Sequence, residues 1–143
     1  MSGAQKPCRV IGQLGEALRQ TFEEDARAAI PAQFDLWPVI EKATGKVVGH
    51  CGLLDKEVEG RAEVELVYVF DPPAWGKGYA TEVAAALRDY ARSVLHLQRI
   101  ISLIEPENEA SERVARKIGM QLEKDTLRPG GRVMRLYFLP LGD

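Results

Sequence analysis

The segment Asp71-Pro-Pro-Ala-Trp-Gly-Lys-Gly-Tyr-Ala-Thr-Glu82 lies where a strand stops and a long helix begins. Proline cannot donate to a β-ladder, so the two prolines end the strand predicted over Glu63–Phe70, which is rich in β-branched and aromatic residues. The apolar positions within Tyr79–Leu95 recur at helical spacing and predict a long amphipathic helix. Arg99–Ile104 is a nearly continuous apolar run, as expected for a strand that is buried on both faces. Strand, helix and strand in this order predict a parallel pair of strands with a right-handed crossover.

Further helices and strands are predicted on both sides of this unit. They lie at Gln13–Ile30 (helix), Leu36–Glu41 (strand), Lys46–Leu54 (strand), Glu109–Ile118 (helix), Gln121–Leu127 (strand) and Arg132–Leu139 (strand). Asn108 is placed to cap the short helix, and Gly119 is placed to end it. The element order predicts an α/β fold in which helices pack on a mixed sheet.

Size and charge exclude several classes of function. The 143 residues have a mass of 15.9 kDa, so we expect 1–143 to form a single domain. The net charge is −2, which lacks the basic excess of a nucleic-acid binder. No apolar run reaches the roughly 18 residues of a membrane span, and the first residues do not have the layout of a signal peptide. We therefore expect a cytoplasmic protein without nucleic-acid or membrane partners, and its two histidines are too few for most metal chemistry.

The glycines of the opening segment predict an anion site. Gly76 and Gly78 directly precede a helix whose first N–H groups have no partner within the helix and carry positive potential. Lys77 adds a positive charge beside them, so a phosphate group could be bound there. A tight turn before a well-started helix would have the same local features. The loop lacks the spacing of a P-loop, and Thr81 occupies the place of the third glycine in a dinucleotide fingerprint.

The loop resembles the acyl-CoA pyrophosphate loop of the GNAT superfamily of N-acetyltransferases, whose pattern is Arg/Gln-x-x-Gly-x-Gly/Ala. Trp75-Gly-Lys-Gly-Tyr-Ala80 matches it except at Trp75, where the family has Arg or Gln. Continued to Thr-Glu, the segment is similar to the variant of the ribosomal-protein N-terminal acetyltransferase (RimJ/RimL-like) branch. Asn108-Glu-Ala-Ser111 and Arg116-Lys-Ile-Gly-Met120 resemble a second block of the family, its Asn-x-x-Ser segment and its Lys-Leu-Gly-Phe helix end.

This resemblance implies a GNAT-like fold of the α/β (α+β) class. Its mixed, mostly antiparallel sheet has one parallel, splayed strand pair and helices on both faces, and acetyl-CoA is the cosubstrate. The pantetheine arm enters between the splayed strands, pairs with the backbone of the first strand, and reaches the Asn108 side chain. The residues implied to bind the cofactor are Tyr68, Val69, Phe70, Trp75, Gly76, Lys77, Gly78, Tyr79, Ala80, Thr81 and Asn108.

The resemblance also suggests a catalytic base. The amine acceptor must lose a proton before it can attack, and Glu65 aligns with a glutamate that is common at this place in the branch. Glu63 shares its strand face, and two nearby carboxylates would raise the pKa of one of them. The structural alternative is that Glu65 pairs with a basic residue or reaches solvent.

A general acid is missing from its usual place. Many relatives have a tyrosine four residues before the glycine at the second helix end, where this chain has Ala115. A CoA thiolate could leave unaided, because its thiol pKa is about 8.5, or Tyr68 or Tyr137 could substitute.

The implied function is acetyl transfer from acetyl-CoA directly to a primary amine, on a peptide N-terminus or a small molecule. Members of this branch open with a strand and two helices, whereas the residues before Leu36 predict one clear helix, so we expect an abbreviated N-terminal part. That feature and Ala115 support the alternative of a non-catalytic acyl-CoA-binding or regulatory module. A homodimer with the Arg132–Leu139 strand near its interface is expected by analogy.

Overall fold

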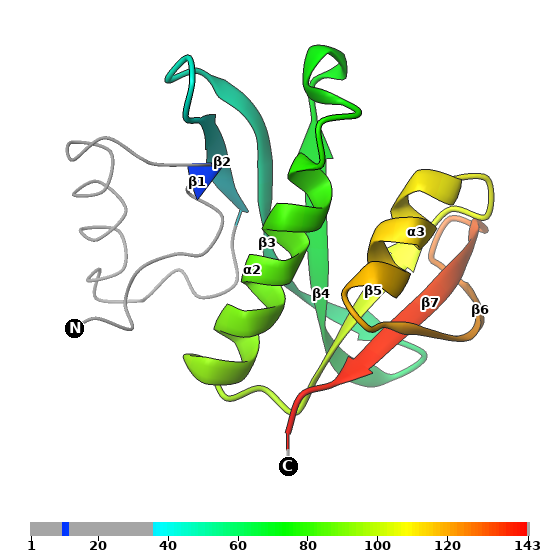
Figure 1. Cartoon of the computed structure of the whole chain (residues 1–143). Coiled ribbons are helices and arrows are strands. Elements are labelled where there is room, and N and C mark those ends of the chain that lie inside the picture. Colours follow the sequence, from blue (N-terminus) through cyan, green and yellow to red (C-terminus); the bar gives the residue numbers. More distant parts are fainter. Residues whose placement is uncertain (1–9, 12–35, 143) are drawn as a thin grey trace.

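The computed structural model describes residues 10–11 and 36–142, and the helix predicted over Gln13–Ile30 lies outside the described residues. The described elements are β1 (Val10–Ile11), β2 (Leu36–Glu41), β3 (Val47–Val58), β4 (Arg61–Phe70), the 3₁₀ helix η3 (Pro72–Ala74), α2 (Tyr79–Ser93), β5 (Arg99–Ile104), α3 (Glu109–Lys117), β6 (Gln121–Leu127) and β7 (Val133–Pro140) (Figure 1).

The described strands form one mixed sheet of seven strands in the order β1-β2-β3-β4-β5-β7-β6. Four of the six neighbouring pairs are antiparallel, which confirms the prediction of a mostly antiparallel sheet. β4 and β5 form the predicted parallel pair. The two-residue strand β1 adds a second parallel pair with β2, which the sequence did not predict.

The parallel pair at the centre of the sheet is splayed. β4 and β5 pair only at Glu65 and Ile101. On its other edge, β4 pairs with β3 along its whole length, from Gly49–Phe70 to Val58–Arg61. Figure 1 shows β4 and β5 diverging from their point of contact. Next to this pair, the Ser102 hydroxyl of β5 donates to the Leu66 carbonyl oxygen at 3.3 Å. Within the described part of the chain, residues 67–70 of β4 therefore have no paired strand on the β5 side.

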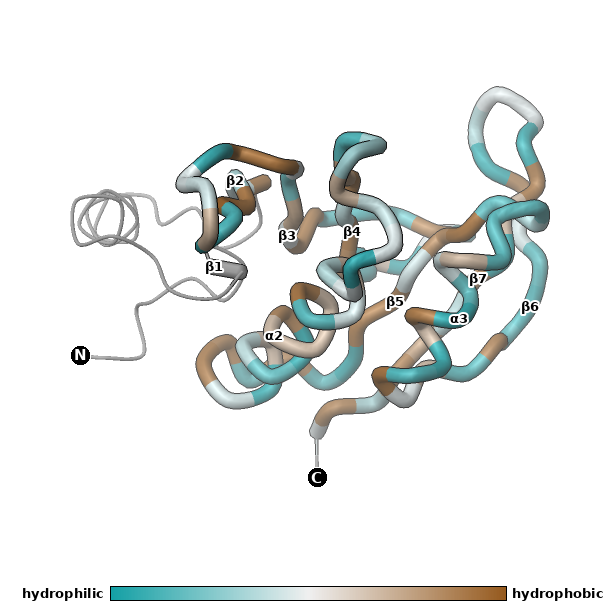
Figure 2. The backbone as a smooth tube through the Cα atoms, turned by 45° about the horizontal axis from the view of Figure 1, so that its top comes forward, coloured by the Kyte–Doolittle hydropathy of each residue, from teal (hydrophilic) through white to brown (hydrophobic). Residues whose placement is uncertain are grey.

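Both described helices pack on the same face of the sheet (Figures 1 and 2). α2 and α3 contribute to one core cluster together with strand residues; its helical members are Val83, Ala84, Leu87, Ala91 and Ala115. The opposite face carries a smaller cluster of Val58, Ile101 and Leu136. The resemblance implied helices on both faces, whereas the helices of the described residues cover only one.

Three of the predicted strands have different bounds in the structure. β3 continues to Val58, four residues past the predicted end at Leu54, because the polar run Asp55-Lys-Glu57 pairs with the start of β4. β4 begins at Arg61, two residues before its predicted start, and β7 runs from Val133 to Pro140, one residue later at each end than predicted. In the sheet β7 lies between β5 and β6, and the homodimer expected by analogy stays a prediction.

Close packing of β3 on the end of β4 depends on Gly49. A Cβ atom at this position would overlap the Val69 carbonyl oxygen and lie 3.0 Å from the Phe70 Cα atom, both of which are backbone atoms. We expect Gly49→Ala to lower the free energy of unfolding by about 2–3 kcal/mol, because the strands must move apart. Urea denaturation measures the loss, and His50→Ala, at an exposed neighbour on the same strand, is the control. Equal denaturation midpoints for Gly49→Ala and the wild type would contradict the packing account.

Candidate functional site

The loop between β4 and α2 has an open surface. Gly76 and Gly78 adopt φ angles of 77° and 82°, in the left-handed region that favours glycine. A Cβ atom at either position would meet no heavy atom within 4 Å. Backbone conformation therefore requires these glycines, and the space in front of them can admit a ligand.

The N-terminus of α2 offers donors to that space. Gly78 is the N-cap residue and makes no side-chain capping bond, while its carbonyl accepts from the Glu82 N–H at 3.1 Å. The N–H groups of the first turn are those that have no acceptor within a helix, and the helix dipole adds positive potential to them. These donors could serve an anion as the sequence predicts, although Glu82 in the first turn already offsets part of the potential.

Trp75 braces this loop. Its indole Nε1–H donates to the Phe70 carbonyl oxygen at 2.8 Å, and its side chain is 66% exposed. The resemblance implied that Trp75 binds the cofactor. In the structure its polar atom ties the loop to the end of β4, which leaves the ring face exposed to a ligand.

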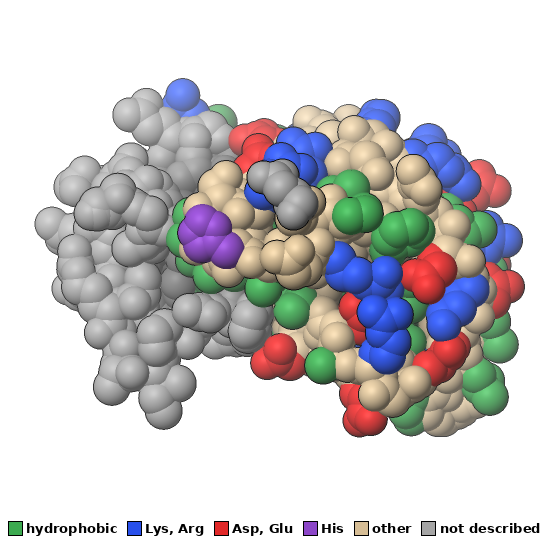
Figure 3. All heavy atoms as spheres, turned by 90° about the horizontal axis from the view of Figure 1, so that it is seen from below, with side chains coloured by type: hydrophobic (Ala, Val, Ile, Leu, Met, Phe, Trp, Pro, Cys, Tyr) green, Lys and Arg blue, Asp and Glu red, His purple; other side chains and the backbone are tan. Residues whose placement is uncertain are grey.

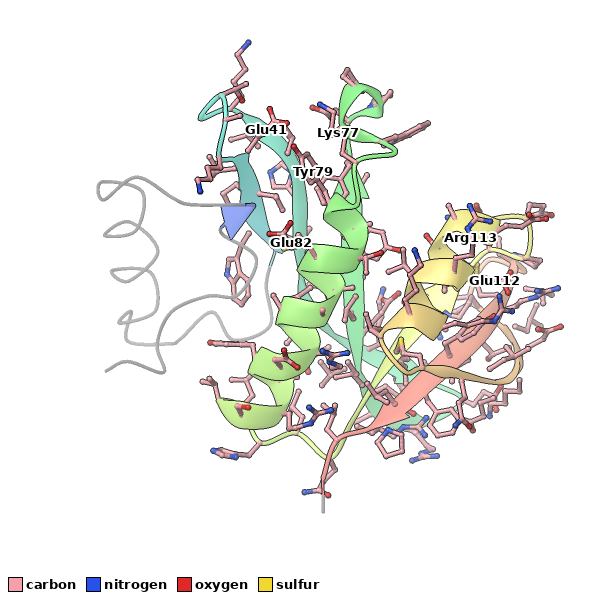
Figure 4. All side chains as sticks on the ribbon, viewed as in Figure 1. Glu41, Lys77, Tyr79, Glu82, Glu112 and Arg113 are labelled. Carbon is pink, nitrogen blue, oxygen red and sulfur yellow. The ribbon has the colours of Figure 1, made fainter. Side chains whose placement is uncertain are left out.

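Glu41 of β2 contacts two residues of the predicted anion loop (Figure 4). Its carboxylate accepts from the Tyr79 hydroxyl at 2.5 Å and lies 3.6 Å from the Lys77 Nζ atom. The Tyr79 bond lowers the pKa of Glu41, and the same bond raises the pKa of Tyr79. The charge that Lys77 was predicted to offer an anion is therefore shared with Glu41. Sequence reasoning missed Glu41, because it precedes Tyr79 by 38 positions and belongs to another strand.

Asn108 lies across the splayed pair from this loop, at the start of α3. Its Oδ1 atom accepts from the Ser111 backbone N–H at 3.1 Å, which confirms the predicted cap. The side chain is exposed, and an asparagine amide also carries an NH₂ group that this bond does not use. Asn108 can therefore cap α3 and donate to a ligand at the same time.

Glu65 lies at the one point where β4 and β5 pair. It is 7% exposed, and its carboxylate accepts from the Leu103 backbone N–H and lies 3.5 Å from the Lys56 Nζ atom. Burial raises the pKa of Glu65, against the opposing effects of Lys56, the Leu103 N–H and Arg128. Glu65 thus pairs with a basic residue, as the structural alternative expected. It also has the raised pKa that suits a general base.

Glu63 does not contribute to this shift, contrary to the prediction. It shares the strand face of Glu65 and is equally buried, but Arg99 binds both its carboxylate oxygens, at 3.0 and 2.8 Å. The guanidinium neutralises Glu63 locally. The raised pKa of Glu65 therefore arises from its own burial rather than from a second carboxylate.

The two tyrosines considered as general acids lie in different surroundings. Tyr137 is fully buried, donates to Glu112 at 2.5 Å and accepts from Arg116 at 3.0 Å. Tyr68 is half-buried, and its hydroxyl donates to the Ser111 Oγ atom at 3.2 Å. That bond joins β4 to α3, across the gap where the strands diverge.

No group of three or more His, Cys, Asp or Glu side chains in the described part of the chain could hold a metal ion. None of its helices is long and apolar enough to cross a membrane. Figure 3 shows one face on which basic and acidic side chains are interspersed rather than gathered into a basic surface.

The open loop and the splayed strands are features that the resemblance implied, and the capped helix is one that the residues predicted. A family model, described as an acetyltransferase (GNAT) domain, matches residues 12–121. The chain belongs to the GNAT acetyltransferase family. This GNAT domain is 38% identical to the uncharacterized protein YkkB of Bacillus subtilis. The matched region covers 71% of this chain and 59% of YkkB.

Two further relatives are similar over more of the domain. Spermidine N(1)-acetyltransferase of Escherichia coli K12 is 29% identical, over 92% of this chain and 73% of the relative. The crystal structure of a GNAT-family acetyltransferase from Bacillus anthracis superposes with a TM-score of 0.64 at 29% identity, over 86% of this chain and 72% of the other. The fold and family are thus shown, and the chain spans about three fifths of the length of its curated relative YkkB.

Proposed function

We propose that this GNAT domain is an acetyl-CoA-dependent N-acetyltransferase that transfers an acetyl group directly to a primary amine. The observation that carries the proposal is the unpaired edge of β4 beyond Leu66, which lies beside the open N-terminus of α2. An extended pantetheine chain can pair with such an edge, while the helix N-terminus takes the diphosphate.

Three parts of the described chain would each bind a different part of acetyl-CoA. The backbone of residues 68–70 would hold the thioester end, because these residues follow the point where the strands separate. The N–H groups of residues 76–81 would bind the diphosphate, with Trp75 bracing their loop. Asn108 would donate its free amide group to the pantetheine from the other side of the gap.

Glu65 would then act as the general base. An α-amino group has a pKa of about 8 and a lysine amine a pKa of about 10.4, so the acceptor is largely protonated at neutral pH. A carboxylate with a raised pKa can take the proton as the amine nitrogen attacks the thioester carbonyl. The C–N bond forms, the C–S bond breaks, and the electron pair of the C–S bond leaves with sulfur.

For the acceptor, we propose a peptide N-terminus first and a small-molecule amine second. The segment Trp75-Gly-Lys-Gly-Tyr-Ala-Thr-Glu82 resembles the RimJ/RimL-like branch, which supports the peptide. The similarity to a spermidine acetyltransferase supports a small amine. Two expectations accompany this proposal: a cytoplasmic location, from the composition, and a homodimer, by analogy with the family.

The proposal is tested by thiol release from acetyl-CoA with a panel of peptides and polyamines. We expect at least one amine to accelerate release above the rate of hydrolysis. If CoA binds in calorimetry but no amine accelerates release, the domain is the non-catalytic acyl-CoA-binding module that Ala115 favours. If CoA does not bind, both functions are wrong.

The Glu41–Lys77 contact leads to a prediction about cofactor affinity. Glu41→Gln keeps an acceptor for the Tyr79 hydroxyl but removes the charge that competes for Lys77. We expect acetyl-CoA to bind about two- to fivefold more tightly, because the ammonium can then serve the diphosphate. Calorimetry at low salt measures the change. The double variant Glu41→Gln/Lys77→Met should bind no more tightly than Lys77→Met alone, and a gain in that background would show that Lys77 is not the cause.

A further inference from the structure

We infer that Tyr68 is the general acid that protonates the departing CoA thiolate, and that Ser111 holds its phenol in place. This inference rests on the proposed function. In many relatives, a tyrosine at the position of Ala115 in α3 is expected to supply this proton. Here the hydroxyl group comes from β4, on the other side of the gap between the splayed strands.

Tyr68 is the tyrosine whose hydroxyl crosses the gap between the splayed strands. Its ring rises from the stretch of β4 that follows the Glu65–Ile101 pair, on the sheet face that α2 covers. Its hydroxyl reaches the Ser111 Oγ atom in the first turn of α3, at 3.2 Å. The phenol and the backbone proposed to hold the thioester thus belong to the same three-residue stretch of β4.

The hydroxyl also reaches the correct face of α3. Ser111 and Ala115 are four residues apart, so their side chains share one face of the helix, one turn apart. Ala115 is 3% exposed and has no proton to give. The Tyr68 hydroxyl contacts the same face of α3 at Ser111. It therefore places a proton donor one helical turn from Ala115, where many relatives have a tyrosine.

Tyr137 does not offer the same chemistry. Its hydroxyl already donates to the Glu112 carboxylate and accepts from Arg116, and Arg135 binds the same carboxylate. To donate elsewhere it would have to break a buried, charge-assisted bond. By contrast, the Tyr68 hydroxyl bonds a neutral, rotatable serine hydroxyl, which can turn away when a ligand enters.

The protonation state of Tyr68 fits a donor. Burial raises the pKa of its phenol and outweighs the opposing effect of the Ser111 bond, and no charged group contributes to the shift. The phenol therefore keeps its proton throughout the neutral range. In the proposed step, the C–S bond of the thioester breaks, sulfur takes the electron pair, and the Tyr68 O–H proton passes to sulfur. The phenolate then recovers a proton from solvent through the Ser111 hydroxyl, while the amine proton leaves through Glu65.

The test compares Tyr68→Phe with Tyr90→Phe, a half-buried tyrosine on α2 that packs edge-on against Trp37. With acetyl-CoA and an acceptor that turns over, we expect Tyr68→Phe to lower kcat about tenfold, because a thiolate is a good leaving group and needs only part of the usual help from an acid. The KM for acetyl-CoA should change less than about threefold, and the solvent isotope effect on kcat should change. Tyr90→Phe should match the wild type in all three.

Ser111→Ala is the second variant and leaves the phenol in place. It should lower kcat by a smaller factor with no loss of CoA affinity, and Ser111→Thr, which keeps a hydroxyl, should restore the rate. An unchanged kcat and isotope effect in Tyr68→Phe would overturn the inference while leaving acetyl transfer established. Loss of CoA affinity in Tyr68→Phe would overturn it in favour of a binding role. If the wild type itself shows no amine-dependent thiol release, the proposed function fails, and the inference fails with it.

Discussion

Glu65→Gln is expected to lower kcat at least a hundredfold in the acetyl-transfer assay. The glutamine has nearly the same shape and can still accept from the Leu103 N–H. The splayed arrangement of β4 and β5 should therefore persist. It cannot accept the amine proton, and general-base catalysis is worth about 10²–10⁴ in rate. The loss should therefore appear in kcat rather than in the affinity for acetyl-CoA.

The matched control is Glu63→Gln, two positions away on the same strand face. Glu63 is equally buried, but Arg99 holds its carboxylate. This variant should lose stability, because it weakens a buried ion pair, yet kcat per folded molecule should stay within about twofold of the wild type. A similar fall in kcat in both variants would indicate that disturbance of the strand, rather than the loss of a base, explains the effect.

The pH dependence of the rate and of the stability also tests whether Glu65 is the general base. Burial raises the pKa of Glu65 in the folded protein above its value in the unfolded chain. The wild-type rate should rise with pH through this raised pKa, since the base must be ionised, and Glu65→Gln should lack that limb. Stability should change in the opposite sense: the wild type loses stability relative to Glu65→Gln as pH rises through the same pKa, because the folded state then holds a buried charge. Thermal melts across acidic and neutral pH measure the second effect.

Gly78→Ala is expected to weaken CoA binding at least tenfold. Gly78 has a φ of 82° and stands as the N-cap of α2, so an added methyl group would strain the backbone and narrow the approach to the N–H groups. Calorimetric titration with CoA measures the loss. A variant that binds CoA as tightly as the wild type would place the diphosphate elsewhere.

Gly130→Ala controls for the cost of strain. Gly130 has a φ of 95° in the turn between β6 and β7, and its Cβ atom would also meet nothing within 4 Å. Both variants should lose a similar free energy of unfolding, about 1 kcal/mol. Only Gly78→Ala should lose CoA affinity, because the β6–β7 turn contributes no group to the proposed CoA site.

Local patterns in the sequence predicted the elements that depend on neighbouring residues. Leu36–Glu41, Arg99–Ile104 and Gln121–Leu127 begin and end as predicted, because turn residues and prolines bound them. Asn108 caps α3 through Ser111, and Gly119 adopts a φ of 101° after it. Each of these features is set by residues within a few positions along the chain.

Contacts between distant segments were not predictable in the same way. Nothing near Lys77 in the sequence indicates that Glu41 would share its charge, and nothing near Glu63 indicates its bond to Arg99. The Tyr68–Ser111 bond joins residues 43 positions apart. The sequence therefore predicted Glu65 as the base but left the choice between Tyr68 and Tyr137 open, since that choice depends on the partner that each hydroxyl finds in the folded chain.

A crystal structure of the protein soaked with CoA tests the central claim most directly. We expect density for the diphosphate within hydrogen-bond distance of the N–H groups of residues 76–81, and for the pantetheine along residues 68–70 of β4. Diphosphate density away from this helix N-terminus, with the β4 edge closed against β5, would contradict the account.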